Sequence, residues 1–240
     1  MRVEVLFPEV CNLFGDLANI RYLKKCCPDL DVIETGLKSR PVFLDEQVDL
    51  VYMGATTERG LGLVIDALRG VREELIARID GGQLMLVTGT TMDVLGTSIH
   101  SDWGLELEGL GIFETKAEYK MLRRHNSMFL GTFEDMEIVG FKSQFGLTCG
   151  APSGGELFTT VRGFGRCGGV GEVKEEGFRR GGLMATYLIG PLLPMNPPFT
   201  KYLLRKMGAD DTLAFENVAM EAYRRRLAEF HSPAFDPIYH

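Results

Sequence analysis

The hydrophobic positions in the first half of the chain alternate between short apolar runs and helical repeats. The apolar runs predict buried strands at residues 3–7, 31–36, 49–54 and 83–87. Apolar residues spaced three and four apart predict helices at 16–26 and 61–79. Strands that alternate with helices pair in parallel through right-handed crossovers. This half therefore predicts an α/β fold: a Rossmann- or flavodoxin-like layered sheet that is mainly parallel.

The middle of the chain has another pattern. From about 104 to 162, short alternating runs without helical periodicity predict additional β-strands joined by turns, which extend or flank the sheet. A glycine-rich stretch at 163–171 predicts a loop, and the apolar run at 181–190 predicts a further strand.

Two helices are expected at the C-terminal end. One begins near Pro197 with Asn196 as its cap, and the other spans about 211–230. The sequence holds no linker, internal repeat or low-complexity tract. We therefore expect one domain over residues 1–240, a length sufficient for one sizeable core.

Residues 84–96 read LMLVTGTTMDVLG, a buried strand that runs into a sharp turn and a short helix. Many α/β enzymes mount a nucleophile at such a turn. Here the turn residue is Gly89, which has no side chain. Thr88, Thr90 and Thr91 lie next to it, but a threonine nucleophile needs an adjacent base, and no histidine is placed beside this turn.

Ligands of parallel sheets bind beyond the carboxyl ends of the strands. We therefore expect the turns at 8–19, 54–60 and 88–92 to share one edge. In the segment TTERG, residues 56–60, the hydroxyl and backbone N–H groups either bind an anion or cap the next helix. Asp16 is similarly placed to cap the first helix or to contact a ligand.

Charge and composition argue against several classes of partner and location. A net charge of −7 argues against nucleic acid or an anionic membrane as the main partner. No apolar run approaches the roughly 18 residues of a membrane span, and the first apolar run is too short for a signal peptide, so we expect a cytoplasmic protein. The cysteines are odd in number and form no CxxC pair, which predicts reduced thiols and no metal site; they are Cys11, Cys26, Cys27, Cys149 and Cys167.

The stretch GFGRCG, residues 163–168, fits the GxGxxG spacing of a dinucleotide-binding loop. No helical pattern follows it, so no helix N-terminus would face a pyrophosphate. We expect a loop at the rim of a site and no cofactor.

Several longer segments resemble the CobB/CobQ-like class I glutamine amidotransferases, in order and in spacing, over about residues 6–206. They are FPEVCNLFGDLANIRYLKK, DLVYMGATTERG, LVTGTTMDVLG, IVGFKSQFG and, most specifically, GEVKEEGFRRGGLMATYLIGPLLPMNPPFTKYLL. The resemblance implies a Rossmann-like domain that hydrolyses glutamine and passes ammonia to a Mur-ligase-like synthetase, on which ATP and metal would sit. It also implies cell-wall precursor or cobalamin-type amidation.

The resemblance also assigns site positions. The family's elbow, CGGYQLLG, aligns its nucleophilic cysteine with Gly89. The histidine base of TYLHGPLLP falls on Ile189, and the histidine of GFENHGG falls on Gln144. The glycine triplet associated with the oxyanion hole appears as Gly54-Ala55-Thr56.

Both halves of the implied cysteine–histidine dyad are therefore replaced. Removing nucleophile and base from a covalent hydrolase costs on the order of a million-fold in turnover. The sequence predicts a glutaminase-inactive subunit that binds a Mur-ligase-like synthetase as scaffold or regulator, in a heterodimer.

Two alternatives stay open from the sequence. In the first, the pocket is reused for another reaction, in which Thr88, Thr90, Glu58 or Asp93 takes part. This pocket would hold glutamine or another small polar ligand. Alternatively, Cys149 or Cys167 enters the site as a relocated nucleophile.

Overall fold

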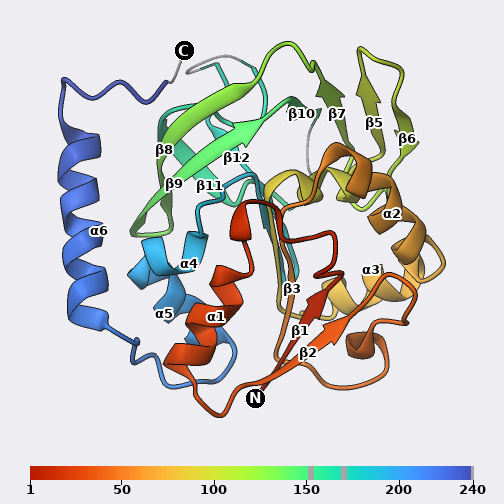
Figure 1. Cartoon of the computed structure of the whole chain (residues 1–240), viewed down its shortest axis with the longest axis horizontal. Helices are drawn as coiled ribbons and strands as arrows, with labels where there is room; N and C mark the ends of the chain where they lie inside the picture. Colours follow the sequence, from red (N-terminus) through yellow and green to blue (C-terminus); the bar gives the residue numbers. More distant parts are fainter. Residues whose placement is uncertain (151–153, 169–171, 239–240) are drawn as a thin grey trace.

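A six-stranded sheet forms the centre of the molecule in the computed structural model, which describes residues 1–150, 154–168 and 172–238 (Figure 1). The strand order is β13-β14-β4-β3-β1-β2. The strands are β1 (Arg2–Leu6), β2 (Asp31–Thr35), β3 (Leu50–Met53), β4 (Met85–Thr88), β13 (Phe178–Arg180) and β14 (Leu183–Thr186). All neighbours pair in parallel except β13, which is antiparallel to β14. The expectation of a mainly parallel α/β sheet is confirmed.

Two further sheets of four strands each flank the central sheet, as the pattern of the middle segment predicts. The first has the order β10-β7-β5-β6 and the second β12-β11-β8-β9. The first sheet consists of β5 (Ser98–Ser101), β6 (Glu106–Glu108), β7 (Thr115–Tyr119) and β10 (Gly146–Gly150). The second consists of β8 (His125–Phe133), β9 (Met136–Gln144), β11 (Phe158–Arg162) and β12 (Glu175–Glu176).

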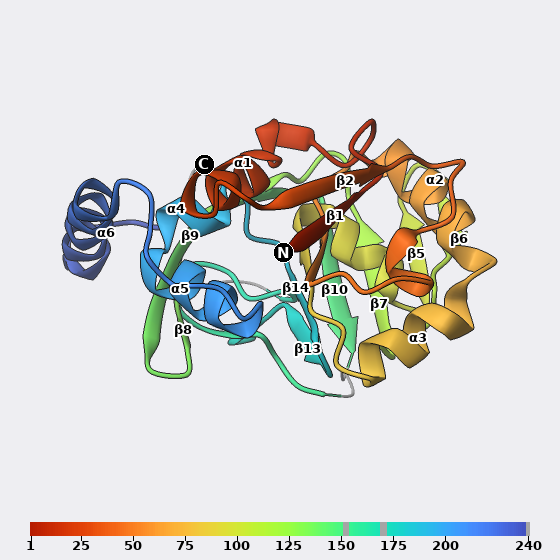
Figure 2. The same ribbon diagram turned by 90° about the horizontal axis from the view of Figure 1, so that it is seen from below.

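The helices cover both sides of the central sheet. Figure 2 shows α1, α4 and α5 on one side and α2 and α3 on the other, with α6 at the outer end. Their bounds are α1 (Ala18–Cys26), α2 (Glu58–Arg69), α3 (Arg72–Asp80), α4 (Leu192–Met195), α5 (Pro197–Lys206) and α6 (Glu216–His231). Three short 3₁₀ helices are η1 (Leu13–Gly15), η2 (Val42–Leu44) and η3 (Gly89–Leu95).

Two expectations about helices were wrong. The single helix predicted over 61–79 is two helices, since α2 ends at Arg69 and α3 begins at Arg72. Asn196 does precede α5, but its side chain makes no cap hydrogen bond. It instead bonds both backbone groups of Val139 at 2.8 Å, which ties α5 to β9.

The inner strands β14, β4, β3 and β1 of the central sheet are buried on both faces, which explains their continuous apolar runs. Alternate residues of β3 point to opposite sides. Val51 and Met53 join the core under α2 and α3, whereas Leu50 and Tyr52 join the core under α1 and α5. A third, smaller cluster holds α6 against β8 and β9 through Tyr223 and Phe230. Among the helices within the described ranges, none is long and apolar enough to cross a membrane.

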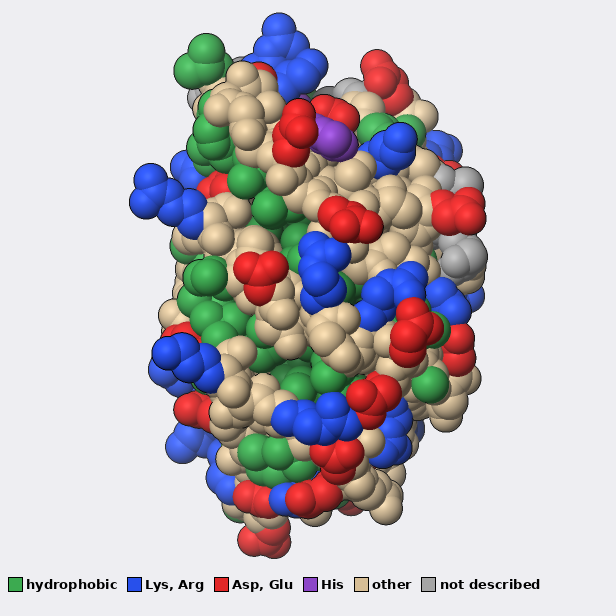
Figure 3. Space-filling view, turned by 90° about the vertical axis from the view of Figure 1, so that its right-hand side faces the viewer, with side chains coloured by type: hydrophobic (Ala, Val, Ile, Leu, Met, Phe, Trp, Pro, Cys, Tyr) green, Lys and Arg blue, Asp and Glu red, His purple; other side chains and the backbone are tan. Residues whose placement is uncertain are grey.

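The face formed by α2, α3 and β6 carries both signs of charge, with hydrophobic side chains visible between them (Figure 3). Exposed ion pairs cross between elements here, such as Arg40 with Glu74 and Arg69 with Glu108. Pairs of this kind contribute little to stability because water screens them.

Candidate functional site

Gly89 lies where β4 ends and η3 begins. Its φ of +66° is in the left-handed region, which glycine adopts without strain. The strand therefore turns sharply into a helix at the position that the resemblance assigns to the nucleophile. The backbone has the shape expected of an elbow.

Two side chains fill the space above this elbow. A Cβ added to Gly89 would lie closer than 3.0 Å to the Cβ of Ala55, a separation that real Cβ atoms essentially never show. It would also lie 3.3 Å from Cγ2 of Ile189. Both residues are buried. The structure thus brings Gly89, Ala55 and Ile189 together, and it leaves no room for a side chain at position 89.

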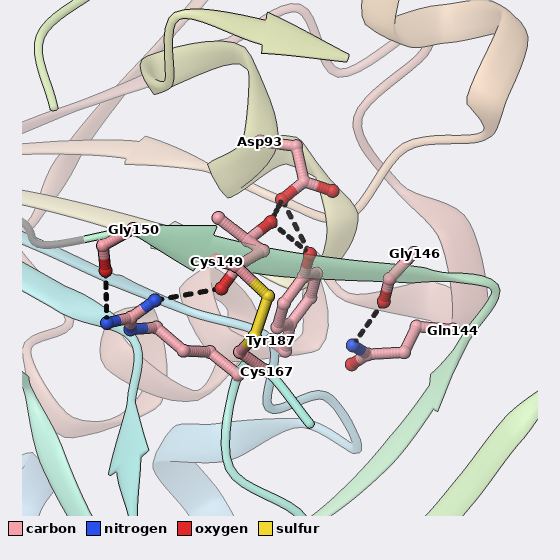
Figure 4. Close-up of a disulfide and its surroundings, with 9 residues drawn as sticks. Asp93, Gln144, Gly146, Cys149, Gly150, Cys167 and Tyr187 are labelled. Atoms are coloured by element: carbon pink, nitrogen blue, oxygen red, sulfur yellow. Dashed lines mark hydrogen bonds between the residues drawn. A yellow bond between two sulfur atoms is a disulfide. The ribbon is translucent and has the colours of Figure 1, made fainter. Parts of the chain in front are cut away.

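Gln144 lies near the same region, but its side chain bonds a neighbouring residue in sequence. Ile189 forms an isolated bridge with Phe141 of β9, three residues before Gln144. The buried amide of Gln144 donates a hydrogen bond to the carbonyl oxygen of Gly146 at 2.7 Å (Figure 4). Its Oε1 atom has no hydrogen-bond partner among the described residues.

The threonines of the candidate site all donate to protein acceptors. Thr56 bonds Val10, Thr90 bonds Thr56 and Thr91 bonds Gly54, in each case at the carbonyl oxygen and at 2.6 to 2.8 Å. Thr88 donates to the carboxylate of Asp16. Each hydroxyl proton is committed to an acceptor, and these side chains are buried. They hold the turns together and are not poised as nucleophiles.

Asp16 joins the three turns that the sequence places at one edge. Its carboxylate accepts a hydrogen bond from the backbone N–H of Ala55 at 2.9 Å and another from the Thr88 hydroxyl. Burial raises the pKa of this carboxyl group. Asp16 was expected to cap α1 or contact a ligand. Its carboxylate instead accepts the hydrogen bond of the Ala55 N–H, and Ala55 is one of the oxyanion-hole candidates.

The start of α2 settles the reading of TTERG. Thr57 is the N-cap residue, and its hydroxyl oxygen accepts a hydrogen bond from the N–H of Gly60 at 3.2 Å. The capping alternative is therefore confirmed. Glu58 stands in the first turn of α2, where a negative charge complements the helix dipole.

Asp93 is the centre of a buried cluster of hydroxyl groups. Its carboxylate accepts hydrogen bonds from Tyr119 and Thr148 at 2.5 Å. It accepts a third from Tyr187 at 2.6 Å (Figure 4). Burial raises the pKa of Asp93 to about 6, although the three hydroxyl donors lower it. The cluster joins η3, β7, β10 and the segment after β14. Asp93 therefore holds elements together beneath the elbow.

We expect Asp93 to make stability depend on pH. Between its ordinary pKa of 3.8 and the raised value of about 6, the folded chain keeps a proton that the unfolded chain releases. Raising the pH through this window should therefore remove about 3 kcal/mol of unfolding free energy. In Asp93→Asn the part of this loss due to Asp93 should vanish, leaving the part due to Asp16, whose pKa burial also raises. In the exposed Asp66→Asn the whole loss should remain. Urea unfolding at several pH values measures it, and equal slopes in both variants would contradict the assignment.

The cysteines correct another expectation. Cys149 and Cys167 form a disulfide that joins β10 to the glycine-rich loop, with Cα atoms 5.2 Å apart (Figure 4). Reduced thiols were expected for all five cysteines because no spacing motif marks this pair. The remaining three are free, and burial raises the pKa of Cys11 to about 12. A relocated nucleophile from Cys149 or Cys167 does not fit, because each sulfur is bonded to the other.

The glycine-rich loop is fixed by Arg166. Its guanidinium donates to the carbonyl oxygens of Thr148 and Gly150 at 2.8 and 2.7 Å, beside the disulfide. The next elements described after the loop are the strands β12, β13 and β14. Residues 169–171 of the predicted loop lie outside the described residues.

A buried ion pair beneath this loop was missed from the sequence. Lys142 of β9 contacts Glu176 of β12 at 2.5 Å, and both side chains are almost fully buried. Lys142 also donates to the carbonyl oxygens of Phe164 and Gly165. The signal was present in β9, where Lys142 shares a strand face with Ile138 and Gly140. Within the described ranges, no group of three or more potential ligands is placed to hold a metal ion.

Comparison with known proteins identifies the family and agrees with the fold. Residues 2–197 match the model of the CobB/CobQ-like glutamine amidotransferase domain. The chain is 31% identical over 209 residues to the subunit GatD of the glutamine-hydrolysing lipid II isoglutaminyl synthase of Staphylococcus aureus. This match covers 85% of the present chain and 83% of GatD.

Solved structures show the same fold. A glutamine amidotransferase crystal structure matches with a TM-score of 0.56 at 15% identity and covers 86% of this chain and 99% of that one. A glutamine amidotransferase from Thermotoga maritima matches with a TM-score of 0.50 at 11% identity and covers 95% and 92% of the two chains. The chain therefore belongs to the family of CobB/CobQ-like glutamine amidotransferase domains.

Proposed function

We propose that this chain is a glutaminase-inactive, GatD-like subunit that binds a Mur-ligase-like synthetase as scaffold or regulator in cell-wall precursor amidation. The observation that carries the proposal is the filled elbow. Gly89 stands at the family's nucleophile position, and the Cβ of Ala55 occupies the place that the first carbon of a side chain would need.

The surroundings of the elbow support the same reading. Ile189, at the family's base position, has no exchangeable proton and packs toward Gly89. The Ala55 N–H, which could otherwise stabilise an oxyanion, bonds the Asp16 carboxylate. A negative charge held there would repel a developing oxyanion instead of stabilising it.

Reuse of the pocket for another reaction has less support. The hydroxyls of Thr88 and Thr90 donate to buried acceptors. Asp93 is buried under three hydroxyl donors, and Glu58 stands at the start of α2. Thr88, Thr90 and Asp93 are therefore not presented as a free acid, base or nucleophile.

The test measures both binding and glutamine hydrolysis. The purified chain is mixed with a Mur-ligase-like synthetase from the same source. We expect a stable complex, and we expect glutamine hydrolysis at background level. The synthetase should still amidate its acceptor when free ammonia replaces glutamine. Turnover of glutamine comparable to that of ordinary amidotransferases would refute the inactive assignment, and absence of a complex would refute the subunit assignment.

A further inference from the structure

The free edge of the central sheet is strand β2. It pairs with β1 on one side and ends the strand order on the other. In Figure 2, β2 runs along the outer margin of the sheet with α1 beside it. The N–H of Asp31 donates to the carbonyl oxygen of Met1, and the carbonyl oxygen of Thr35 accepts from the N–H of Phe7, so both groups face the β1 side. Along a strand, the N–H and C=O groups of successive residues point to opposite sides in alternation. The backbone groups of Val32 and Glu34 therefore point away from the sheet.

An apolar groove lies between this edge and α1. It has a volume of about 480 Å³, and Val5, Leu17, Ile20 and Val32 form most of its wall. Exposed edges are usually blunted by proline, bulges or inward charges, because they invite pairing with another chain. Here the edge strand pairs with β1 in an unbroken register, and an apolar groove runs beside it.

The rim of the groove is basic. Arg21, Lys24 and Lys25 of α1 line it, against a single carboxylate, that of Glu34. This local excess of positive charge stands out in a chain of net charge −7. It favours an occupant that carries carboxylates beside apolar side chains.

We propose that β2 and this groove, together the β2 surface, receive an extended acidic segment of the synthetase subunit, which adds to the sheet as a further strand. The main-chain groups of Val32 and Glu34 would bond the segment. Its apolar side chains would cover Leu17, Ile20 and Val32, and its carboxylates would meet Arg21 and Lys25. Strand addition of this kind takes affinity from main-chain bonds and specificity from alternate side chains.

Two other occupants fit less well. A second copy pairing edge to edge through a two-fold axis normal to the sheet would bring two α1 helices together on one face, and their cations would repel. The described C-terminal segment of the chain is engaged elsewhere, since the N–H of Met128 bonds the carbonyl oxygen of Pro237 and Ser127 bridges Ile238.

The proposal rests on the proposed function for the identity of the partner. The experiment measures the Kd of the purified synthetase for the intact chain and its variants. Val32→Pro removes one outward N–H without removing a bond to β1, and we expect it to raise the Kd by about tenfold or more. Val32→Ala, which keeps the N–H, should change the Kd by less than about threefold.

Reversing the charge of the basic rim is an independent test, because it leaves strand β2 unchanged. Arg21→Glu combined with Lys25→Glu should raise the Kd by about tenfold at low salt, and the effect should shrink as salt increases. The matched control is Arg224→Glu with Arg225→Glu, which makes the same charge change at two exposed arginines of α6 and should leave the Kd unchanged.

The outcomes separate the two proposals. If the wild-type chain binds the synthetase and Val32→Pro binds equally well, the strand addition is wrong. If Arg21→Glu with Lys25→Glu behaves like the α6 control, the acidic occupant is wrong. If the complex forms through the β2 surface but hydrolyses glutamine rapidly, the inactive assignment fails and the docking surface stands. If the wild-type chain does not bind at all, both proposals fail.

Discussion

A cysteine at position 89 should react with a glutamine-mimicking electrophile only when position 55 is also changed to glycine. In Gly89→Cys with Ile189→His, the new Cβ meets the Cβ of Ala55 inside 3.0 Å. The elbow must then distort, and a thiol displaced by about 1 Å loses its aim at the substrate. Adding Ala55→Gly removes the obstructing carbon, and we expect close to complete labelling of the triple variant.

The measurement is intact mass after labelling, followed by the rate of glutamine hydrolysis. We expect the triple variant to exceed the double variant by about a hundredfold in labelling rate, a part of the million-fold range of a complete dyad. Equal labelling of the two variants would contradict the steric argument.

A control without chemistry uses alanine. Gly89→Ala should cost about 1–3 kcal/mol of unfolding free energy through overpacking, and Ala55→Gly should restore part of that loss. If the two substitutions are additive in stability, the two carbons do not compete for the same space.

Lys142→Met should destabilise the chain by about 3–5 kcal/mol, because it leaves the buried carboxylate of Glu176 without its cation. Lys142 and Glu176 are 1% and 0% exposed. Lys142→Met also removes the donor that serves the carbonyl oxygens of Phe164 and Gly165. Burial lowers the pKa of Lys142. Desolvation thus opposes the charged form of Lys142, and the contact with Glu176 favours it.

The matched control is Lys201→Met, which breaks the more exposed pair with Glu216 and should cost about 1 kcal/mol or less. The double variant Lys142→Met with Glu176→Gln should lose less than the sum of its single changes, because no unpaired charge stays buried. Urea unfolding at pH 7 gives these values. A cost for Lys142→Met no larger than that for Lys201→Met would contradict the assignment of a buried pair.

Much of the fold followed from local pattern. The runs at 3–7, 49–54 and 83–87 became β1, β3 and β4, because inner strands buried on both faces need continuous apolar residues. The run at 31–36 became the edge strand β2, which is only partly buried. The break between α2 and α3 was not predicted. Apolar spacing continues through Gly70 and Val71, and periodicity carries no signal for a change of helix axis.

The candidate site, like the fold, could be predicted only in part from the sequence. The turn at Gly89 could be located from the strand–turn–helix pattern, since a left-handed backbone at such a turn favours glycine. The contact of Gly89 with Ala55 could not be predicted, because these residues are 34 positions apart and meet only through the parallel sheet. The bonds of Asp16 to Ala55 and Thr88 are of the same long-range kind. The Cys149–Cys167 disulfide likewise carries no spacing motif that would have revealed it.

The contact between positions 55 and 89 also bears on how the chain responds to single mutations. Any side chain at 89 would place its Cβ inside 3.0 Å of the Cβ of Ala55. One substitution at 89 therefore gives the elbow no room for a thiol, and a nucleophile there requires paired changes at both positions.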